Sequence, residues 1–267
     1  MRRKITIAIA IAVAPLLFCL TPLLPGAESA VLDGVEFCWR VPANGGADGR
    51  IMVLFGGRNW PARKTLETFR FDELADRHGL FLLAASFRDR EYWEPQAWSG
   101  PLLLRAVALI ERRYGLSSRK LLLYGYSAGG QCSNLFYAWM PERVAAWGAH
   151  GCGVYFRGEI AHPAPAFLSC GVRDAERFAI SREFVYHYRE AGGALLWKYS
   201  LESGHELTPE ALALARAWFD AFLSGERCRS YGEDDTGRIV PASRLDSIDP
   251  EFRNPLYEGA VTELWKR

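Results

Sequence analysis

The sequence has 267 residues, the length of one full-sized domain with short appendages, and 49% of them are hydrophobic, which is enough for a substantial core. Charged residues make up 24%, near the usual share for a globular protein, and this excludes wholesale disorder. The formal charge of +1 argues against a nucleic-acid partner, because such proteins carry a strongly basic surface.

The beginning of the chain has the pattern of an export signal. Three basic residues at 2–4 precede an uncharged, mostly apolar stretch at 5–24, and the Ala-Glu-Ser sequence that ends at Ser29 offers the small residues that a signal peptidase reads. We therefore expect residues 1–29 to be a signal peptide and the protein to be secreted or periplasmic. The alternative is an uncleaved membrane anchor, since twenty uncharged residues can span a bilayer. A membrane is an expected partner only in that case.

Removal of residues 1–29 would change the formal charge from +1 to −1, because three basic residues and one acidic residue are lost. Five cysteines would remain, namely Cys38, Cys132, Cys152, Cys170 and Cys228. Export permits disulfides, and an odd number leaves at least one cysteine unpaired or paired between chains. Cys132 and Cys152 are the expected pair if a disulfide forms, whereas buried free thiols are the alternative. No spacing of cysteine and histidine resembles a zinc site, so we expect no metal.

From residue 50 onward, short apolar runs alternate with amphipathic stretches. The apolar runs predict strands at 51–55, 80–85, 120–124, 144–149, 166–170 and 194–199. Apolar residues at helical spacing predict helices at 65–77, 103–114, 128–140, 180–190 and 211–222.

This order predicts an α/β fold with a mainly parallel central sheet and helices on both faces. The strands lack strict polar alternation, as expected of strands that are buried on both sides. The segment 31–41 is expected to add one antiparallel strand at an edge. We assign residues 30–224 to this domain. Residues 225–267 are a polar C-terminal extension, whose scattered apolar side chains predict that it packs on the domain.

The clearest motif is Gly125-Tyr126-Ser127-Ala128-Gly129, which matches G-x-S-x-G. An apolar run at 121–124 precedes it and a helical run at 131–140 follows it. A strand-turn-helix elbow places a serine in a strained conformation and needs small neighbours, which this segment supplies. Ser127 is therefore the candidate nucleophile, and the alternative is a solvated serine in a glycine-rich turn.

A serine nucleophile needs a base and an acid that orients the base, in the chain order Ser, Asp or Glu, His. His205 lies just past the strand at 194–199 and is the candidate base. Asp174 follows the strand at 166–170 and is the candidate acid, with Glu176 as the nearest rival and Glu202 as a weaker one. The other four histidines fit the position of the base less well, and they are His78, His150, His162 and His187. Among them, His150 is expected to be a structural histidine or to line the pocket.

Attack on an ester carbonyl also needs N–H donors for the developing oxyanion. One expected donor is the N–H of Ala128. Gly57 is the preferred second donor, with Arg58 close behind, because two glycines after the strand at 51–55 allow close approach to a substrate. The alternative is a simple turn that leads to Trp60.

These four motifs, in this order, resemble the α/β-hydrolase superfamily over residues 50–223: Gly56-Gly57, Gly125 to Gly130, Gly171 to Asp174, and Gly204-His205. The Ser-Ala-Gly-Gly elbow and the export signal are most similar to secreted bacterial esterases of the polyhydroxybutyrate depolymerase and feruloyl esterase type. Many of those relatives carry histidine where this chain has Phe55. The resemblance implies ester hydrolysis through an acyl-enzyme, without a metal or organic cofactor.

The expected substrate is a small-molecule or polymeric ester. Arg58, Trp60 and Trp93 follow predicted strand ends and are candidate substrate-binding residues, although ordinary packing is an equal alternative for the aromatic side chains. Two other functions remain open. One is a serine peptidase of the same fold, and the other is a non-catalytic binding protein on a hydrolase scaffold.

Overall fold

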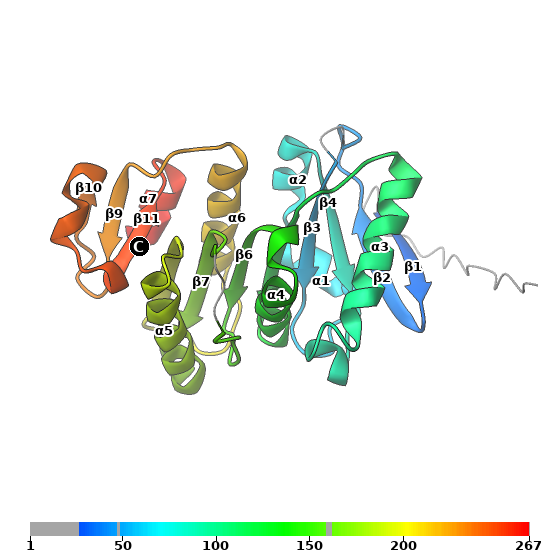
Figure 1. The fold of residues 1–267 in the computed structure, drawn as a ribbon, viewed down its shortest axis with the longest axis horizontal. Coiled ribbons are helices and arrows are strands. Elements are labelled where there is room, and N and C mark those ends of the chain that lie inside the picture. The colour runs from blue at the N-terminus through cyan, green and yellow to red at the C-terminus, as the bar shows by residue number, and fades with distance from the viewer. Residues whose placement is uncertain (1–26, 47–48, 159–161, 267) are drawn as a thin grey trace, which may run out of the picture.

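The computed structural model describes residues 27–46, 49–158 and 162–266. It contains a central eight-stranded sheet with the order β1-β2-β4-β3-β5-β6-β7-β8 (Figure 1). β1 and β2 are antiparallel, as are β2 and β4, and all other neighbours are parallel. The prediction of a mainly parallel sheet is therefore confirmed. The strands are β1 (Ala27–Leu32), β2 (Val35–Arg40), β3 (Arg50–Phe55), β4 (Leu80–Ala85), β5 (Leu121–Tyr126), β6 (Val144–His150), β7 (Ala166–Gly171) and β8 (Leu195–Ser200).

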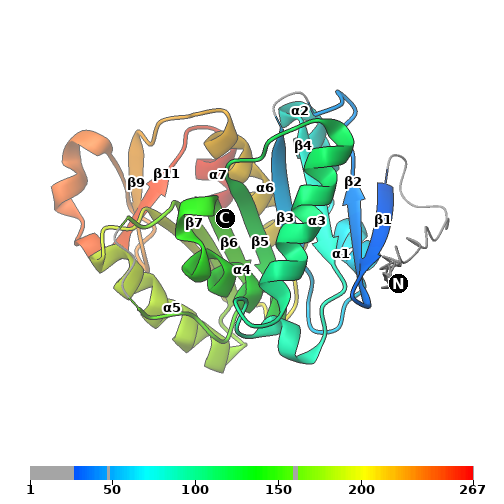
Figure 2. The ribbon, with the colours of Figure 1, turned by 45° about the vertical axis from the view of Figure 1, so that its right-hand side comes forward.

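Helices cover both faces of this sheet (Figure 2). The side chains of β3 show why the strands of this sheet lack polar alternation. Ile51, Val53 and Phe55 belong to the core cluster on one face, and Met52 and Leu54 belong to the cluster on the other face. The first cluster lies under α3, α4 and α5, and the second under α1, α2 and α6. The helices are α1 (Ala62–Phe69), α2 (Asp72–His78), α3 (Ser99–Tyr114), α4 (Ala128–Trp139), α5 (Ala175–Glu190) and α6 (Pro209–Leu223). No helix in the described ranges is long and apolar enough to cross a membrane.

The single helix predicted at 65–77 is wrong, because the chain breaks there into α1 and α2. Arg70 ends α1 in the left-handed conformation with φ 51°, and its N–H donates to Leu66 O. Residues two apart on one helix point in nearly opposite directions. The break instead lets Phe69 and Phe71 both pack on Tyr124, with ring centroids 5.5 and 5.6 Å away.

The antiparallel edge predicted at 31–41 is confirmed, but its extent is wrong, because the structure has a hairpin of β1 and β2 there and not a single strand. Asp33 and Gly34 turn the chain with φ of 48° and 83°, the left-handed pair that a two-residue hairpin loop requires. Glu28 lies in β1 and accepts a hydrogen bond from the Tyr114 hydroxyl at 2.7 Å. A cut after Ser29 would therefore divide β1. The rest of the expected signal peptide, residues 1–26, lies outside the described residues.

The C-terminal extension forms a small sheet with the order β10-β9-β11, followed by a helix. Figure 1 shows it at the end of the molecule opposite β1. β11 contacts β8, and the last helix contacts α6. The elements are β9 (Ser230–Glu233), β10 (Ile239–Pro241), the 3-10 turns η3 (Ala242–Ser247) and η4 (Pro250–Phe252), β11 (Arg253–Leu256) and α7 (Ala260–Lys266).

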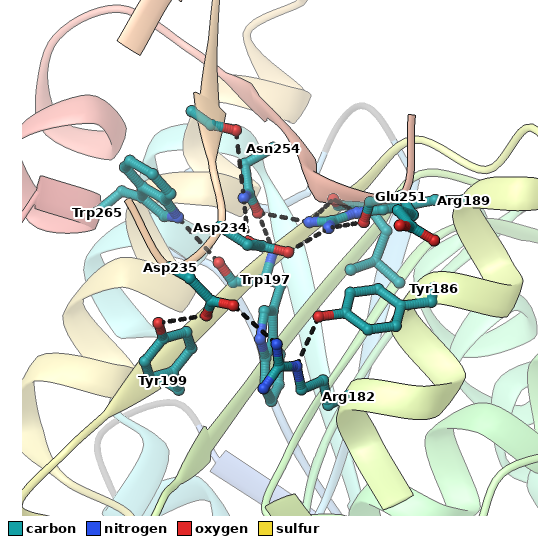
Figure 3. A network of polar contacts seen from close by, with 12 residues as sticks. Arg182, Tyr186, Arg189, Trp197, Tyr199, Asp234, Asp235, Glu251, Asn254 and Trp265 are labelled. Atoms are coloured by element: carbon teal, nitrogen blue, oxygen red, sulfur yellow. Dashed lines mark hydrogen bonds and ion pairs between the residues drawn. The ribbon is translucent and has the colours of Figure 1, made fainter. Parts of the chain in front are cut away.

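A buried polar network joins this extension to α5 and β8 (Figure 3). Arg189 donates from Nη1 to Asp234 Oδ2 at 2.6 Å and from Nη2 to Asn254 Oδ1 at 2.7 Å. Asn254 Oδ1 also accepts the backbone N–H of Trp197 at 2.7 Å, and Trp265 Nε1 donates to Trp197 O at 2.9 Å. The extension thus satisfies both main-chain groups of Trp197 on the edge strand β8, where an open edge would invite pairing with another chain.

The buried ion pair predicts a large cost when one partner alone is removed. The side chains of Arg189 and Asp234 are each 3% exposed, so Arg189→Met leaves a buried carboxylate unpaired. We expect the free energy of unfolding, measured by urea denaturation, to fall by about 3–5 kcal/mol. The double variant Arg189→Met/Asp234→Leu should lose less, because no charge then remains unpaired.

Arg182→Met is the matched control, because Arg182 pairs with Asp235 at the surface. We expect that change to cost less than about 1 kcal/mol. Equal losses for Arg182→Met and Arg189→Met would contradict a special role for the buried pair.

Candidate active site

Ser127 lies between the end of β5 and the start of α4, at the carboxyl edge of the sheet. Its backbone has φ 55° and ψ −121°, a conformation that serine rarely adopts. The surrounding structure holds it there, because the Ser127 N–H donates to His150 O at 2.9 Å and Ser127 O accepts from the Gln131 N–H at 3.2 Å. The side chain is thereby exposed above the sheet at the amino end of α4.

Two glycines make this turn possible because the chain passes very close to itself. A Cβ on Gly125 would lie 1.9 Å from Gly129 O, and a Cβ on Gly129 would lie 2.0 Å from Phe55 O. Both distances are far below any van der Waals contact. The glycines of the G-x-S-x-G pattern are therefore required by the crossing of β5, α4 and the end of β3.

The structure brings Ser127, His205 and Asp174 together in one hydrogen-bonded chain. Ser127 Oγ lies 2.8 Å from His205 Nε2, and His205 Nδ1 lies 2.6 Å from Asp174 Oδ2. A carboxylate can only accept, so the neutral imidazole donates from Nδ1 and leaves the Nε2 lone pair facing the serine hydroxyl. The other carboxylate oxygen, Asp174 Oδ1, accepts from Arg177 Nη1 at 3.1 Å.

The loop that carries His205 is fixed by groups on two neighbouring strands. The Tyr126 hydroxyl donates to His205 O, and the rings of the two residues are stacked with centroids 5.4 Å apart. His150 supports the next residue in the loop, because its Nε2 lies 2.9 Å from Glu206 O. A carbonyl oxygen cannot donate, so Nε2 carries the hydrogen, and Nδ1 accepts from the Ser169 hydroxyl at 2.8 Å.

His150 is therefore a structural histidine, one of the two roles expected of it. Burial lowers the pKa of His150 to about 4, so the ring stays neutral at physiological pH and keeps its donor on Glu206 O. The two rival acids do not bond to His205, whose Nδ1 is taken by Asp174. Glu176 is exposed at the rim of the site, and Glu202 pairs with Arg173.

A cavity of about 360 Å³ opens beside Ser127. Its lining residues come from the segments after β3, β4, β6 and β7 and from the start of α4. Of the expected residues, Arg58, Trp93 and Ala128 line it, together with Ser127. The described lining residues are Arg58, Asp89, Tyr92, Trp93, Ser127, Ala128, Gln131, Gly153, Val154, Glu176 and Arg177.

Four of the expected residues are not among those lining residues: Asp174 and His205, which reach Ser127 from one side through their hydrogen bonds, and Gly57 and Trp60. Trp60 packs on Tyr126, with ring centroids 5.5 Å apart, and Lys64 Nζ lies over the Trp60 ring, 4.2 Å from its centroid. Gly57 lies beneath the Trp60 ring, where an added Cβ would come within 3.1 Å of it, and Gly57 O accepts the Trp60 N–H at 3.0 Å.

The sequence reasoning missed Gln131 and Arg177. Arg177 could have been found, because it lies three residues after Asp174 at the start of a helix, where such pairs meet. Gln131 had no local signal, since its contact with Tyr92 joins segments that are distant in the sequence.

The structure does not form the expected disulfide. All five cysteines of the described residues are free thiols. The sulfur atoms of the expected pair face different carbonyl groups, since Cys132 Sγ lies 3.8 Å from Glu91 O and Cys152 Sγ lies 2.9 Å from Val154 O. Within the described residues, no group of three or more His, Cys, Asp or Glu side chains is placed to hold a metal ion.

Comparisons with known proteins identify the fold. No protein-family model and no curated protein matches the sequence. Among solved structures, the esterase PE8 is 21% identical, with a TM-score of 0.54, and the match covers 67% of this chain and 95% of that one. LpqC, a poly(3-hydroxybutyrate) depolymerase from Bordetella parapertussis, is 17% identical, with a TM-score of 0.55 and coverage of 84% and 94%. A ferulic acid esterase is 11% identical, with a TM-score of 0.56 and coverage of 74% and 94%. The chain therefore has the α/β-hydrolase fold.

The lowered pKa of His150 predicts how the free energy of unfolding depends on pH. Its pKa is about 4 in the folded protein, against about 6.5 in an unfolded chain, so the unfolded chain binds the proton more readily. The stability that this depressed pKa provides is complete above pH 6.5 and is lost as the pH falls toward 4, by about 3 kcal/mol at pH 4.

Urea denaturation between pH 7 and pH 4 should therefore show a steeper loss for the wild type than for His150→Gln, which has no group that titrates at this position. Parallel curves for the two proteins would contradict this account of His150.

Proposed function

We propose that the protein is a serine hydrolase that cleaves carboxylic esters through an acyl-enzyme intermediate. The observation that carries this proposal is the hydrogen-bonded chain from Ser127 Oγ through His205 to Asp174 Oδ2, built on a strained elbow at the carboxyl edge of an α/β-hydrolase sheet. Serine is a poor nucleophile at neutral pH, and this arrangement is the one that activates it.

In this mechanism Ser127 Oγ attacks the ester carbonyl while His205 Nε2 takes its proton. Asp174 keeps the imidazole in the correct tautomer and stabilises the imidazolium that forms. The imidazolium then gives its proton to the leaving alcohol, and an acyl group remains on Ser127. A water molecule, activated by His205 in the same way, attacks this acyl group. The carboxylic acid then leaves and the free serine is restored.

Backbone N–H groups stabilise the oxyanion in both steps. Ala128 is the first residue of α4, so its N–H has no partner within the helix and lies at the positive end of the helix dipole. The second donor comes from the turn after β3, at Gly57 or Arg58. Arg58 lines the cavity beside Ala128, whereas Gly57 lies under Trp60, and this favours the Arg58 N–H.

Ester substrates, small or polymeric, are supported by the cavity and by the names of the similar structures, which include a poly(3-hydroxybutyrate) depolymerase and a ferulic acid esterase. Trp93 is 49% exposed at the cavity and offers an aromatic surface to an acyl or alcohol group. The alternatives are a serine peptidase and a non-catalytic binding protein. A fluorophosphonate probe reacts only with an activated serine, so it separates a non-catalytic binding protein from the two enzymes. Parallel assays on esters and peptides then separate an esterase from a peptidase.

Export of the protein to the periplasm or the medium is part of the same proposal, on the strength of the basic start and the apolar run at 5–24. Mass spectrometry of exported protein should show a chain that has lost the apolar run. An intact start at Met1 would instead support a membrane anchor.

The proposed triad predicts a graded series of kinetic effects. Ser127→Ala removes the nucleophile and His205→Ala removes its base, so each should lower kcat on an ester by several orders of magnitude. The double variant should be hardly worse than either, because the two groups act as one unit. Asp174→Asn should also be severe, because it disturbs the histidine tautomer.

Glu176→Gln is the control for Asp174→Asn, because it removes a carboxylate from the same turn without touching His205. We expect a much smaller loss from Glu176→Gln, and each variant is first shown to be folded by circular dichroism. The central proposal fails if folded Ser127→Ala retains wild-type activity, and the acid is wrongly assigned if Glu176→Gln is the worse of the pair.

A further inference from the structure

The hydroxyl of Tyr92 lies among main-chain groups of the turn that follows β3. Tyr92 ends the 3-10 turn η1 (Asp89–Tyr92) between β4 and α3, and it is 6% exposed. Its oxygen accepts the Asn59 N–H at 2.7 Å. The hydroxyl has one hydrogen to donate and two acceptors within reach of its oxygen, Phe87 O at 2.9 Å and Gly57 O at 3.2 Å. One phenol thus contacts both ends of the segment 57–59.

That segment is a tight turn. The Trp60 N–H donates to Gly57 O at 3.0 Å, and Asn59 adopts the left-handed conformation with φ 61°. Arg58 lies between the two residues that Tyr92 contacts. Because a peptide group is planar and trans, Gly57 C=O and Arg58 N–H point in opposite directions. A bond that holds the carbonyl therefore also fixes the direction of the N–H.

Apart from Tyr92, the turn is held by its own hydrogen bond between Trp60 and Gly57 and by the packing of Trp60 on Tyr126. The side chains of Arg58 and Asn59 are exposed. Phe55, at the end of β3, is apolar and packs on Phe87 and Phe136, with ring centroids 6.1 and 5.2 Å away, so it offers no hydrogen bond to the turn. In the described residues, the side-chain hydrogen bonds to the main chain of 57–59 come from Tyr92 alone.

Tyr92 is itself tied to the nucleophile helix. Its carbonyl oxygen accepts a hydrogen bond from Gln131 Nε2 at 2.9 Å. Gln131 lies near the start of α4, and its own backbone N–H donates to Ser127 O. The same residue therefore links the turn after β3 to the helix that presents Ser127 and Ala128.

We propose that Tyr92 is a positioning residue, whose hydroxyl fixes the turn at 57–59 so that a backbone N–H of that turn points at the oxyanion. The inference rests on the proposed serine-hydrolase function. It deepens that function by naming the group that pre-organises one side of the oxyanion hole. The hydroxyl acts through the turn and takes no part in proton transfer.

A further property suits Tyr92 to this role. Burial raises the pKa of Tyr92 to about 12, so the phenol keeps its hydrogen throughout the range in which a serine hydrolase works. Any effect of losing the hydroxyl should therefore be the same at pH 6 and at pH 9.

Tyr92→Phe is the direct test, with Tyr188→Phe as the matched control. Tyr188 is also a buried phenol with three hydrogen-bond contacts, to Ala164 O, Tyr137 Oη and Trp147 Nε1, but it lies on α5 away from the cavity. Removing one oxyanion donor costs about 100- to 1,000-fold in kcat, so a loosened donor should cost about 10- to 100-fold. We expect that loss in Tyr92→Phe with KM little changed, and no comparable loss in Tyr188→Phe.

Two inhibitors separate positioning from a general loss of structure. An alkylboronic acid forms a tetrahedral adduct with the serine and places an oxygen in the oxyanion hole. The carboxylic acid product binds without such an adduct. In Tyr92→Phe the inhibition constant of the boronic acid should rise by about the same factor as kcat falls, whereas that of the product acid should stay within about twofold. Wild-type kcat and wild-type boronic acid affinity in folded Tyr92→Phe would overturn the proposal, as would an equal loss of affinity for both inhibitors.

Amide hydrogen exchange in the wild type gives a second measurement that needs no stable variant. The Asn59 N–H lies in an exposed turn, yet it should exchange slowly because Tyr92 accepts it. Fast exchange at Asn59 would overturn the proposal even if Tyr92→Phe failed to fold. The exchange rate tests the role of Tyr92 separately from the proposed function. The proposed function is refuted, whatever the exchange rate at Asn59, if the wild-type protein neither cleaves esters nor reacts with a fluorophosphonate.

Discussion

The close crossing of the chain at Gly125 and Gly129 is the constraint on which the rest of the site depends. With no side chain at either position, β5 can turn directly into α4 while Gly129 passes against the carbonyl of Phe55 at the end of β3. This contact does more than expose Ser127. It brings the carboxyl end of β3, and with it the turn at 57–59, next to the amino end of α4, and these are the two elements that carry the proposed oxyanion donors. A methyl group at Gly129 would drive these two elements apart.

The remaining parts of the site are held by polar groups that bond to main-chain atoms. Tyr126 and His150 hold carbonyl groups of the loop at 205–206, and Tyr92 holds the turn at 57–59. Each supporting side chain is largely buried, so its hydrogen bond has little competition from water. The loops that carry the reacting groups can therefore stay at the surface, where a substrate reaches them, without losing their geometry.

The C-terminal extension covers the outer edge of the central sheet at β8. β8 is the last strand of the sheet, and its outer edge would expose unpaired main-chain groups. Asn254 accepts the main-chain N–H of Trp197, and Trp265 donates to its carbonyl oxygen. Arg189 and Asp234, which are buried beside them, neutralise each other as an ion pair. Because β8 leads directly into the loop of His205, the extension also steadies the strand from which the histidine loop departs.

The sequence by itself determined the order of strands and helices, the parallel sheet and the residues Ser127, Asp174 and His205, because each of these leaves a local mark: an apolar run, a helical period, or glycines beside a polar residue at a strand end. It did not determine the break at Arg70, the β1–β2 hairpin or the free state of Cys132 and Cys152, although the Asp33-Gly34 pair was a legible turn signal. Tertiary structure alone decided the contacts of Tyr92 with 57–59, of His150 with Glu206 and of Arg189 with Asp234. Each joins segments far apart in the chain, where the identity of a residue carries no record of its partner. Only the packing of strands and helices sets which polar groups are buried together and must therefore bond to one another.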